Sequence, residues 1–497
     1  MPPRMTLQEL IGGSPGGRVL PVSGDPRDAG ETAISSIVHR ADEAGPGALF
    51  CALRGRRADG HDFAAEAVAC GAAAVMVERP LDLAVPQALV PDARLGMALA
   101  AALLAGRPSD DLLVVGVTGT NGKTTSTFLA RAVLEAAGHR CGLIGTIEAR
   151  VGGEAVPVSH TTPDALGLQD LLSRMRAAGD TACAMEVSSH ALAQRRVAGT
   201  RFAAALFTNL TRDHLDYHAD VEDYYMAKRG LFVRPEGEGG DPPGAANLDD
   251  EFGRRLAADA GALGYAVDAP ADVRPLEARG LGTGIAARIA TPRGPVEVES
   301  RLRGRFNLSN LTGAVALGEL LGLDHDAVAA GLGAVAGVPG RFEAVEAGQP
   351  FPVIVDYAHT PDSLENVLRT ARELVAGGRL IAVFGCGGDR DRGKRPQMGA
   401  AARTLADVAV VTSDNPRSED PDAIIAEILA GAREGPGDLV VEADRRAAIA
   451  WAVREADAGD AVVIAGKGHE LGQERDGRVT PFDDRIVARE ALEEARR

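Results

Sequence analysis

The stretch Val115-Gly-Val-Thr-Gly-Thr-Asn-Gly-Lys-Thr-Thr125 decides how the rest of the chain is interpreted. An apolar run from Leu112 to Val117 predicts a buried strand, and apolar residues at helical spacing follow as far as Gly138. A glycine-rich turn between a strand and a helix, closed by Lys and Thr, is typical of a P-loop that holds phosphate. Because Val117 stands where the usual first glycine belongs, a bare glycine-rich turn is the alternative. ATP binding is the working hypothesis.

Composition limits the class of protein. A chain of 497 residues is too long for one core, so about two to four domains are expected. The sequence has 45% hydrophobic residues, no apolar run of membrane length and no apolar signal core at its start. We therefore expect a cytoplasmic protein without membrane insertion. Five scattered cysteines suggest reduced thiols, and a net charge of −17 argues against nucleic acid as a partner.

Lysine is rare in this chain. Of the 53 basic residues only four are lysines, at positions 123, 228, 394 and 467. Lysine offers a compact ammonium for phosphate and an amine that can be deprotonated and modified, which arginine does not. All four lysines are therefore site candidates, with chance survival of an arginine bias as the alternative.

The chain before residue 105 predicts a small α/β unit. Its strands are expected at Ala48–Leu53 and Ala72–Val77, and the basic stretch 54–62 between them is expected to face solvent.

From about residue 110 to 340, strands and helices alternate. Strands predicted at 181–187 and 202–207 run into polar residues, and in parallel sheets such strand ends share one edge with the P-loop. Stretch 235–244 predicts a flexible loop, and 285–290 with 296–299 predicts a hairpin. The polar residues expected to gather at the edge are Glu186, His190, Asp213, His214 and Asp216.

The alternation restarts after residue 341 without a P-loop. A second doubly wound domain is expected there, carrying the other substrate. Its predicted strands are Val353–Asp356, Leu380–Phe384, Val408–Val411 and Ala461–Ile464, with a helix at Arg446–Glu455.

Seven motifs in order carry a family resemblance. They are Thr118-Gly-Thr-Asn-Gly-Lys-Thr-Thr125, His160-Thr-Thr-Pro-Asp164, Met185-Glu-Val-Ser-Ser-His190, Asn209-Leu-Thr-Arg-Asp-His-Leu-Asp-Tyr-His218, Gly304-Arg-Phe-Asn-Leu-Ser-Asn310, Pro339-Gly-Arg-Phe-Glu343 and Asp414-Asn-Pro-Arg417. Together they resemble the Mur ligases of peptidoglycan synthesis, and within them the branch that adds meso-diaminopimelate to UDP-N-acetylmuramoyl-L-alanyl-D-glutamate.

The resemblance implies an α/β protein of three domains. They are a small N-terminal UDP-substrate-binding domain at 1–108, a central P-loop ATPase domain with a mostly parallel sheet at 109–340, and a C-terminal Rossmann-like amino-acid-binding domain at 341–497. It also implies a monomer that uses ATP with Mg²⁺. The substrate carboxylate would become an acyl phosphate, which the amine of diaminopimelate then attacks.

The resemblance also assigns roles to residues. The catalytic and metal set is Lys123, Thr124, Glu186, His214 and Lys228, the last as a carbamate. ATP-binding residues are Gly119, Thr120, Asn121, Gly122, Lys123, Thr124, Thr125, Asn310, Arg341, Asp356 and Lys394. The residues expected to bind the muramoyl dipeptide are Thr161, Thr162, Ser188, Gln194 and Arg196. Those expected to bind diaminopimelate are Arg390, Asp414, Asn415, Pro416, Arg417, Gly466 and Glu470. Lys467 has no role in this assignment, and the favoured interpretation is that it is a lysine retained by chance in an arginine-rich chain.

Two positions depart from the family pattern. Relatives usually carry Asp-Ser-Arg where this chain has Val38-His-Arg40. His39 thus replaces the serine expected near the uridine nucleotide, and the resemblance does not define the uridine contacts there. His160 stands where some relatives have Asn, and either side chain can form a hydrogen bond.

Three other readings remain. A lysine-adding ligase would share all but the Asp414–Arg417 pocket, in which Arg417 can pair with the extra carboxylate of diaminopimelate. A folylpolyglutamate synthetase would share the ATPase core. A nucleotide-binding regulatory protein without ligase activity is the third.

Overall fold

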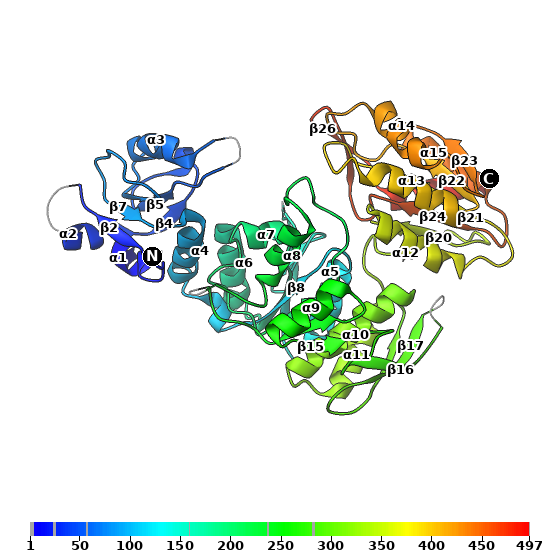
Figure 1. Ribbon diagram of the computed structural model, residues 1–497, viewed down its shortest axis with the longest axis horizontal. Coiled ribbons are helices and arrows are strands. Elements are labelled where there is room, and N and C mark those ends of the chain that lie inside the picture. The colour runs from blue at the N-terminus through cyan, green and yellow to red at the C-terminus, as the bar shows by residue number, and fades with distance from the viewer. Residues whose placement is uncertain are drawn as a thin grey trace.

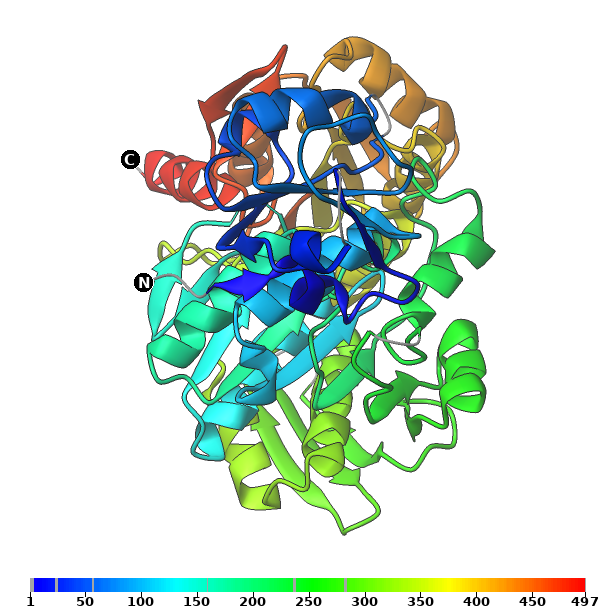
Figure 2. The same cartoon turned by 90° about the vertical axis from the view of Figure 1, so that its left-hand side faces the viewer.

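Three main sheets organise the molecule. The computed structural model describes residues 4–22, 26–55, 58–158, 160–235, 238–280 and 284–496. The N-terminal sheet lies at one end, the central sheet in the middle, and the C-terminal sheet beyond it (Figures 1 and 2). The expected α/β class with three sheet-containing parts is therefore confirmed.

The first sheet follows the order β2-β7-β6-β5-β4 and is parallel except for β2. The elements of this part are β1 Met5–Thr6, α1 Leu7–Ile11, β2 Arg18–Leu20, α2 Pro26–Gly30, β3 Ala33–Ile34, β4 Ser36–Val38, β5 Ala48–Cys51, α3 Ala64–Ala69, β6 Ala74–Val77, β7 Gln87–Leu89 and α4 Ala93–Leu104. Both predicted strands are confirmed as β5 and β6.

The basic stretch between β5 and β6 is not uniformly a solvent loop. Arg54 is exposed as expected, but His61 is buried and accepts a hydrogen bond from the Glu78 amide at 2.9 Å. The prediction was wrong at His61 because the carboxylate of Asp59, 2.6 Å from its ring, gives the imidazole a polar partner inside the fold. Positions 56 and 57 lie outside the described residues.

The central sheet follows the order β11-β10-β9-β12-β8-β13-β14-β15 and is parallel from β9 to β15. Its strands are β8 Leu113–Thr118, β9 Cys141–Ile144, β10 Ala149–Val151, β11 Glu154–Val156, β12 Ala182–Glu186, β13 Ala204–Phe207, β14 Gly244–Asn247 and β15 Leu263–Tyr265. The helices of this part are α5 Lys123–Ala136, α6 Ala165–Ala177, α7 Ser189–Ala193, α8 Val221–Arg229, α9 Glu251–Ala260, α10 Arg305–Leu320 and α11 His325–Ala334.

Both faces of β8 are buried, as its continuous apolar run requires. Val115 and Val117 pack in the core that also contains Leu129 of α5, while Val114 packs in the core on the other face. A Cβ at Gly116 would lie 2.9 Å from the Phe202 ring, so this position needs glycine. The buried strand therefore holds the P-loop on a rigid base.

Two further predictions concern the middle of the chain. The hairpin is confirmed as β17 Ile285–Ala290 and β18 Val296–Ser300, which pair antiparallel beside β16 Arg274–Arg279. The loop predicted at 235–244 was wrong at Gly244, which begins β14, and at Glu238, which is buried in an ion pair of 2.9 Å with Arg195. Positions 236 and 237 of this stretch lie outside the described residues.

The third sheet follows the order β19-β20-β24-β21-β22-β23 and is parallel except for β19. Its strands are β19 Glu343–Ala344, β20 Val353–Asp356, β21 Leu380–Phe384, β22 Val408–Val411, β23 Asp438–Val441 and β24 Ala461–Ala465, and β25 Gly472–Arg475 pairs separately with β26 Arg478–Pro481. The helices are α12 Pro361–Arg372, α13 Lys394–Leu405, α14 Pro421–Gly431, α15 Arg445–Glu455 and α16 Asp484–Ala495. The four predicted strands and the predicted helix are confirmed.

An enclosed ion pair supports the strand ends of this third sheet. Arg445 and Asp484 have fully buried side chains and are joined by hydrogen bonds of 2.8 and 2.7 Å. The guanidinium also donates to the carbonyls of Ala465 and Ser413 at 3.0 and 3.3 Å. It therefore ties the ends of β22 and β24 to α16.

Replacing Arg445 by methionine is expected to destabilise the protein by about 3–5 kcal/mol, because Asp484 would keep a buried charge without its partner. The check is the thermal unfolding temperature of the full chain. The double variant Arg445→Met/Asp484→Leu is the control, since it removes both charges and should recover most of the loss. Equal unfolding temperatures for Arg445→Met and the unchanged protein would contradict the expectation.

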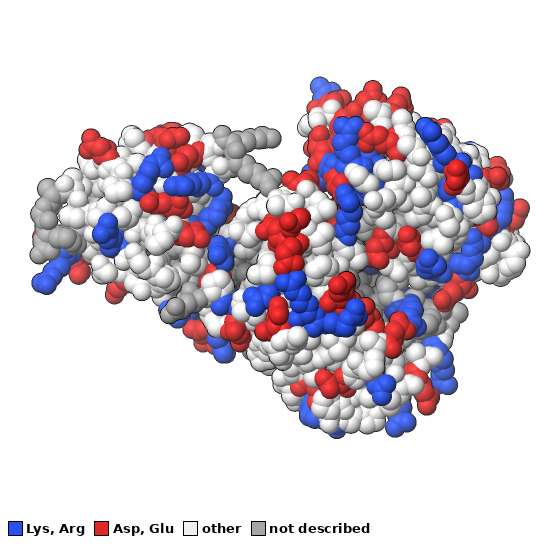
Figure 3. Space-filling view, viewed as in Figure 1, with Lys and Arg blue, Asp and Glu red and all other residues white. Residues whose placement is uncertain are grey.

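None of the helices in the described part of the chain is long and apolar enough to cross a membrane. Acidic and basic side chains are interspersed on the face shown in Figure 3, and a hollow lies between the N-terminal and C-terminal parts above the central one. The expected monomer and cytoplasmic location stay predictions.

Candidate active site

The glycine-rich turn has the backbone shape of a phosphate loop. Gly119 and Gly122 adopt positive φ angles of 149° and 83°, and α5 begins directly after the turn at Lys123. A Cβ at Gly119 would lie 1.9 Å from the Thr208 hydroxyl, and one at Gly122 would lie 2.5 Å from Oδ1 of Asn310. The turn is thus possible only with these glycines, which leave the N-terminus of α5 open to a ligand.

The P-loop lysine is held over this turn. Its Nζ donates to the carbonyls of Gly119 and Thr120 at 2.9 and 2.8 Å. Burial lowers the pKa of Lys123, and the nearby carboxylates of Glu186 and Asp213 oppose that shift. Lys123 lines the same cavity as these two carboxylates, so an anion bound there would meet its ammonium.

One buried carboxylate joins the P-loop to the next strand end. Glu186, at the end of β12, accepts a hydrogen bond from the Thr124 hydroxyl at 3.1 Å. It also accepts bonds from the amide and hydroxyl of Thr146 at 2.8 and 3.1 Å. The Thr146 hydroxyl lies 3.0 Å from that of Thr161. Sequence reasoning missed Thr146, although it follows β9 at the sheet edge where strand-end residues gather.

Lys228 points from α8 into the same cavity. It is 1% exposed, and its Nζ donates to the Gly119 carbonyl at 2.6 Å and lies 4.5 Å from the centroid of the Tyr224 ring. Burial, with a contribution from Lys123, lowers the pKa of Lys228 well below its ordinary value. A lowered pKa favours the neutral amine, which is the form that can act as a nucleophile toward carbon dioxide.

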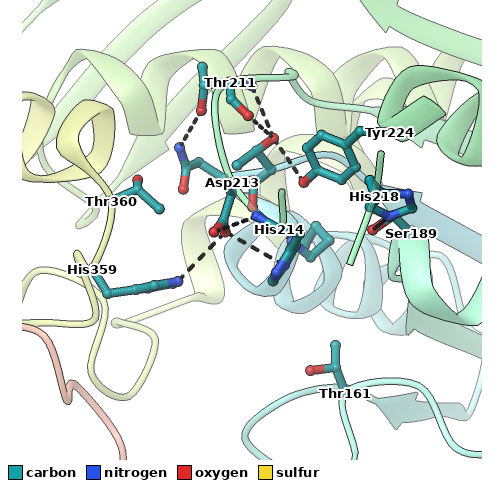
Figure 4. Close-up of polar contacts among 12 residues, drawn as sticks. Thr161, Ser189, Thr211, Asp213, His214, His218, Tyr224, His359 and Thr360 are labelled. Carbon is teal, nitrogen blue, oxygen red and sulfur yellow. Dashed lines mark hydrogen bonds and ion pairs between the residues drawn. The ribbon is translucent and has the colours of Figure 1, made fainter. Parts of the chain in front are cut away.

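Asp213 and two imidazoles form a polar cluster at the end of β13. Figure 4 shows His214 and His359 pointing at the Asp213 carboxylate, at 3.5 and 3.8 Å. Although burial acts in the opposite direction, the hydrogen bond with His359 lowers the pKa of Asp213 well below its usual range. Burial lowers the pKa of His214 to about 3, so its ring is neutral and able to bind a metal.

The expected gathering of five polar side chains is confirmed in part. Glu186, Asp213 and His214 line the cavity, and His190 packs edge-on against His214 with ring centroids 4.8 Å apart. Asp216 was wrongly placed in this group, because it is exposed and absent from the cavity lining. His214 has a φ angle of 55°, and Asp216 lies exposed two residues after this left-handed position.

The residues assigned to the dipeptide form one hydrogen-bonded patch. The Thr162 hydroxyl donates to the Glu186 carbonyl at 2.9 Å and accepts from the Ser188 amide at 3.0 Å. Arg196 donates to the Thr162 carbonyl at 2.8 Å and to Oε1 of Gln194 at 2.8 and 3.1 Å. The structure therefore brings this predicted set together beside the cavity.

His39 of the N-terminal part contacts this patch at its margin. Its Nε2 lies 3.6 Å from the carboxylate of Asp164, whose other oxygen accepts from the Gly167 amide at the start of α6. The hydrogen bond raises the pKa of His39 and lowers that of Asp164 to about 2. The residue that departs from the family pattern thus joins two parts of the molecule.

Residues from the C-terminal part complete the cavity. Arg341 donates to the Thr124 hydroxyl at 2.9 Å and lies 4.4 Å from the centroid of the Tyr357 ring. Asp356 accepts from the Phe342 and Ala358 amides at 2.6 and 2.7 Å, and burial raises the pKa of Asp356.

Three further residues were assigned to the nucleotide, and two of them, Asn121 and Asn310, line the cavity. Asn121 of the P-loop donates to Asp362 of α12 at 2.9 Å, a partner that sequence reasoning missed. Asn310 lines the cavity and is hydrogen-bonded to Ser126 and Asn307. Lys394 is buried at the start of α13 but is not among the lining residues.

The residues assigned to diaminopimelate form a second site around the end of β22. The Arg417 guanidinium donates to the Gly388 carbonyl at 2.7 Å and lies 3.3 Å from Glu474. The Asn415 amide donates to Glu470 at 2.7 Å. A Cβ at Gly466 would lie 2.7 Å from the Asp414 carboxylate, so the chain passes too close for a side chain.

Two basic residues at this second site differ in burial. Arg390 is exposed and donates to the Asp389 carbonyl at 2.9 Å, close to Gly387 beside Arg417. Lys467 is fully buried and bonded to Asn415 and Glu470, so the chance reading was wrong. The small number of lysines in the chain was the sequence signal that could have indicated a specific place for Lys467.

The donor groups at the cavity fit Mg²⁺. Among the described residues no group of three or more His, Cys, Asp or Glu side chains is placed to hold a metal. The donors instead are the Glu186 carboxylate with the Thr124 hydroxyl, next to His214 and Lys228. Mg²⁺ typically takes one or two protein carboxylates and completes its shell with phosphates and water, so this set fits it.

Comparisons with known proteins give the family. Three family models match the chain: "Mur ligase family, catalytic domain" at residues 33–109, "Mur ligase middle domain" at 117–318, and "Mur ligase, glutamate ligase domain" at 340–468.

Two relatives of nearly full length share one name. Both are UDP-N-acetylmuramoyl-L-alanyl-D-glutamate--2,6-diaminopimelate ligases: one from Solibacter usitatus, 47% identical over 93% of this chain and 94% of the relative, and one from Streptomyces coelicolor, 46% identical over 93% of each. A solved structure of a ligase with that name is 34% identical, covers 99% of both chains and has a TM-score of 0.69. The Mycobacterium tuberculosis folylpolyglutamate synthase complexed with ADP and AMPPCP is 20% identical with a TM-score of 0.60 over 76% of this chain and 93% of its own, a likeness of fold alone.

Proposed function

Since this chain belongs to the Mur ligase family, we propose that it uses ATP to join meso-diaminopimelate to UDP-N-acetylmuramoyl-L-alanyl-D-glutamate. The product is an amide, with ADP and inorganic phosphate released, and the step belongs to peptidoglycan precursor synthesis. We propose domain boundaries at 1–108, 109–340 and 341–497 for the three functional parts.

The observation that carries this proposal is the position of Glu186. Its carboxylate contacts Thr124 of the P-loop on one side and Thr146, next to Thr161, on the other. The residues that we assign to phosphate and to the dipeptide therefore lie on either side of a single buried group. Transfer of a phosphoryl group from ATP to a substrate carboxylate requires this neighbourhood, because donor and acceptor must approach in line.

The phosphoryl step is supported by cations from two domains. Lys123 would pair with the transferring phosphate, and Arg341 would reach the same region from across the gap. Both reactants are anionic, and their mutual repulsion must be offset before the carboxylate oxygen can attack the phosphorus. Attack breaks the bond between the γ-phosphorus and its bridging oxygen, leaving ADP and an acyl phosphate.

Mg²⁺ would be held by Thr124, Glu186 and His214, with Lys228 as a carbamate supporting a second ion. When bound, the metal neutralises phosphate charge and orients the oxygens of the transferring group. The depressed pKa of Lys228 supports the carbamate, because only a neutral amine adds carbon dioxide, and the addition releases one proton.

The amide-forming step would use the second site. Arg417 would bind the distal carboxylate of diaminopimelate, and Glu470 would accept from its ammonium, with Asp414, Asn415, Pro416, Gly466 and Arg390 shaping the pocket. The attacking amine adds to the acyl carbon, and the tetrahedral intermediate expels phosphate while the nitrogen loses a proton. Lysine lacks the distal carboxylate, so Arg417 would be left unpaired with that substrate.

Phosphate release from ATP tests the proposal. The protein is mixed with UDP-N-acetylmuramoyl-L-alanyl-D-glutamate and with meso-diaminopimelate, L-lysine or no amino acid. We expect release with diaminopimelate only. Equal release with lysine would retain the ligase and reject the specificity, while release without an amino acid would indicate a nucleotide-hydrolysing regulator. No release in any arm would reject the function.

A further inference from the structure

The loop after β24 contains a lysine that has no part in the proposed mechanism. Lys467 is 0% exposed, although lysine is among the residues least often buried. Its Nζ donates to Oδ1 of Asn415 at 2.9 Å and to Oε2 of Glu470 at 3.0 Å, and it lies 3.8 Å from the Asp414 carboxylate. The ammonium is therefore enclosed by the polar groups of the second site.

These contacts fix the orientation of the groups that would face an amino acid. Oδ1 of Asn415 accepts hydrogen bonds from Lys467 at 2.9 Å and from the Glu474 amide at 3.0 Å. These two donors fix the orientation of the Asn415 side-chain amide, with its oxygen toward them. Its Nδ2 then donates to Oε2 of Glu470 at 2.7 Å. Both hydrogen bonds to Glu470 within the described chain end on Oε2, and the side chain is 30% exposed. Oε1 is thus left for a ligand.

Charge gives a second reason for a cation here. Asp414 and Glu470 are two carboxylates around one ammonium, and the nearby Arg445 is already engaged by Asp484. Without Lys467 the carboxylates would face each other in a largely desolvated loop, where like charges repel strongly. The compact ammonium fits between three acceptors where the wider arginine fork would not.

We propose that Lys467 is a positioning residue for the incoming amino acid: it orients Asn415 and Glu470 so that the free oxygen of Glu470 receives the substrate ammonium. This inference rests on the proposed function and adds a residue to its amino-acid pocket. Lys467 is not among the described residues that line the P-loop cavity, so its effect should be confined to the amino acid.

The test is a double-mutant cycle on the full-length enzyme, after the unchanged protein has been shown to release phosphate with meso-diaminopimelate. KM for diaminopimelate and for ATP is measured for Lys467→Met, Glu470→Gln and the double variant. We expect Lys467→Met alone to raise KM for diaminopimelate about thirtyfold or more and KM for ATP less than about threefold. In the Glu470→Gln background the same change should alter KM for diaminopimelate less than about threefold, because the partner is already lost.

A matched control separates positioning from simple destabilisation. Arg234 is a buried cation of the central part that donates to the carbonyls of Thr200 and Val197. Arg234→Met should lower thermal stability without a selective rise in KM for diaminopimelate. If Lys467→Met does not fold, Lys467→Gln takes its place, since it keeps a donor but not the charge.

The outcomes are distinct. An inactive unchanged protein would reject the proposed function, not the role of Lys467. An active one in which Lys467→Met leaves KM for diaminopimelate unchanged, raises both KM values equally, or has the same effect with and without Glu470 would overturn the positioning role.

Discussion

Replacing Lys228 by alanine is expected to lower the rate of diaminopimelate-dependent phosphate release on the order of a thousandfold. The side chain is enclosed beside Lys123 and His214, and its lowered pKa keeps the amine available for carbamate formation. Alanine removes both the amine and any anion built on it, so the second metal would lose its support. Added short carboxylic acids, which can occupy the vacated space as an anion, are expected to restore part of the rate.

The measurement is phosphate release at saturating substrates, with and without acetate. Arg229→Ala is the matched control, because Arg229 neighbours Lys228 on α8 but pairs with Asp259 outside the cavity. It should keep a rate within about threefold of the unchanged enzyme. An undiminished rate in Lys228→Ala would remove this residue from the mechanism, and a loss that no carboxylic acid relieves would count against the anionic role.

Replacing Arg417 by alanine is expected to raise KM for meso-diaminopimelate about a hundredfold or more, because truncating one partner of a buried charge pair costs about 2–5 kcal/mol. The guanidinium is 21% exposed, and its Nε and Nη1 are directed to Glu474 and Gly388. We assign the remaining nitrogen, Nη2, to the distal carboxylate. Since lysine lacks that carboxylate, the preference for diaminopimelate over lysine should nearly vanish.

Steady-state kinetics with both amino acids and with ATP test this expectation. The control is Arg475→Ala, an exposed arginine of β25 whose ion pair with Asp476 is 3.7 Å long. It should leave all three KM values nearly unchanged. If Arg417→Ala raised KM for ATP and for diaminopimelate by the same factor, the assigned pocket would be wrong.

Much of the fold was accessible from the sequence. The run Leu113–Thr118 is buried on both faces of its strand, and the following glycines leave room only for a phosphate turn, so local pattern sufficed for the strand, the turn and α5. The same held for β20, β21, β22 and β24. The strand β14 has the sequence Gly-Ala-Ala-Asn, without any β-branched or aromatic residue, and Gly244 was therefore assigned to a loop.

Much of the candidate site was also predicted, because parallel strands carry their polar ends to one edge. This rule predicts that Glu186, Asp213 and His214 lie together, as they do in the structure. It failed for Asp216, which is exposed two residues after the left-handed position at His214, because the sequence does not record that backbone angle.

By itself the sequence determined the α/β class, the P-loop and the family motifs, since these depend on residues close together in the chain. Tertiary structure alone decided which groups from different loops form hydrogen bonds. Arg341 bonds to Thr124, Asn121 bonds to Asp362, and the ammonium of Lys467 lies between Asn415 and Glu470. The physical reason is that burial and partner geometry are properties of packed surfaces. A lysine whose sequence position suggested chance is an enclosed charge in the structure, because the loops after β22 and β24 close around it.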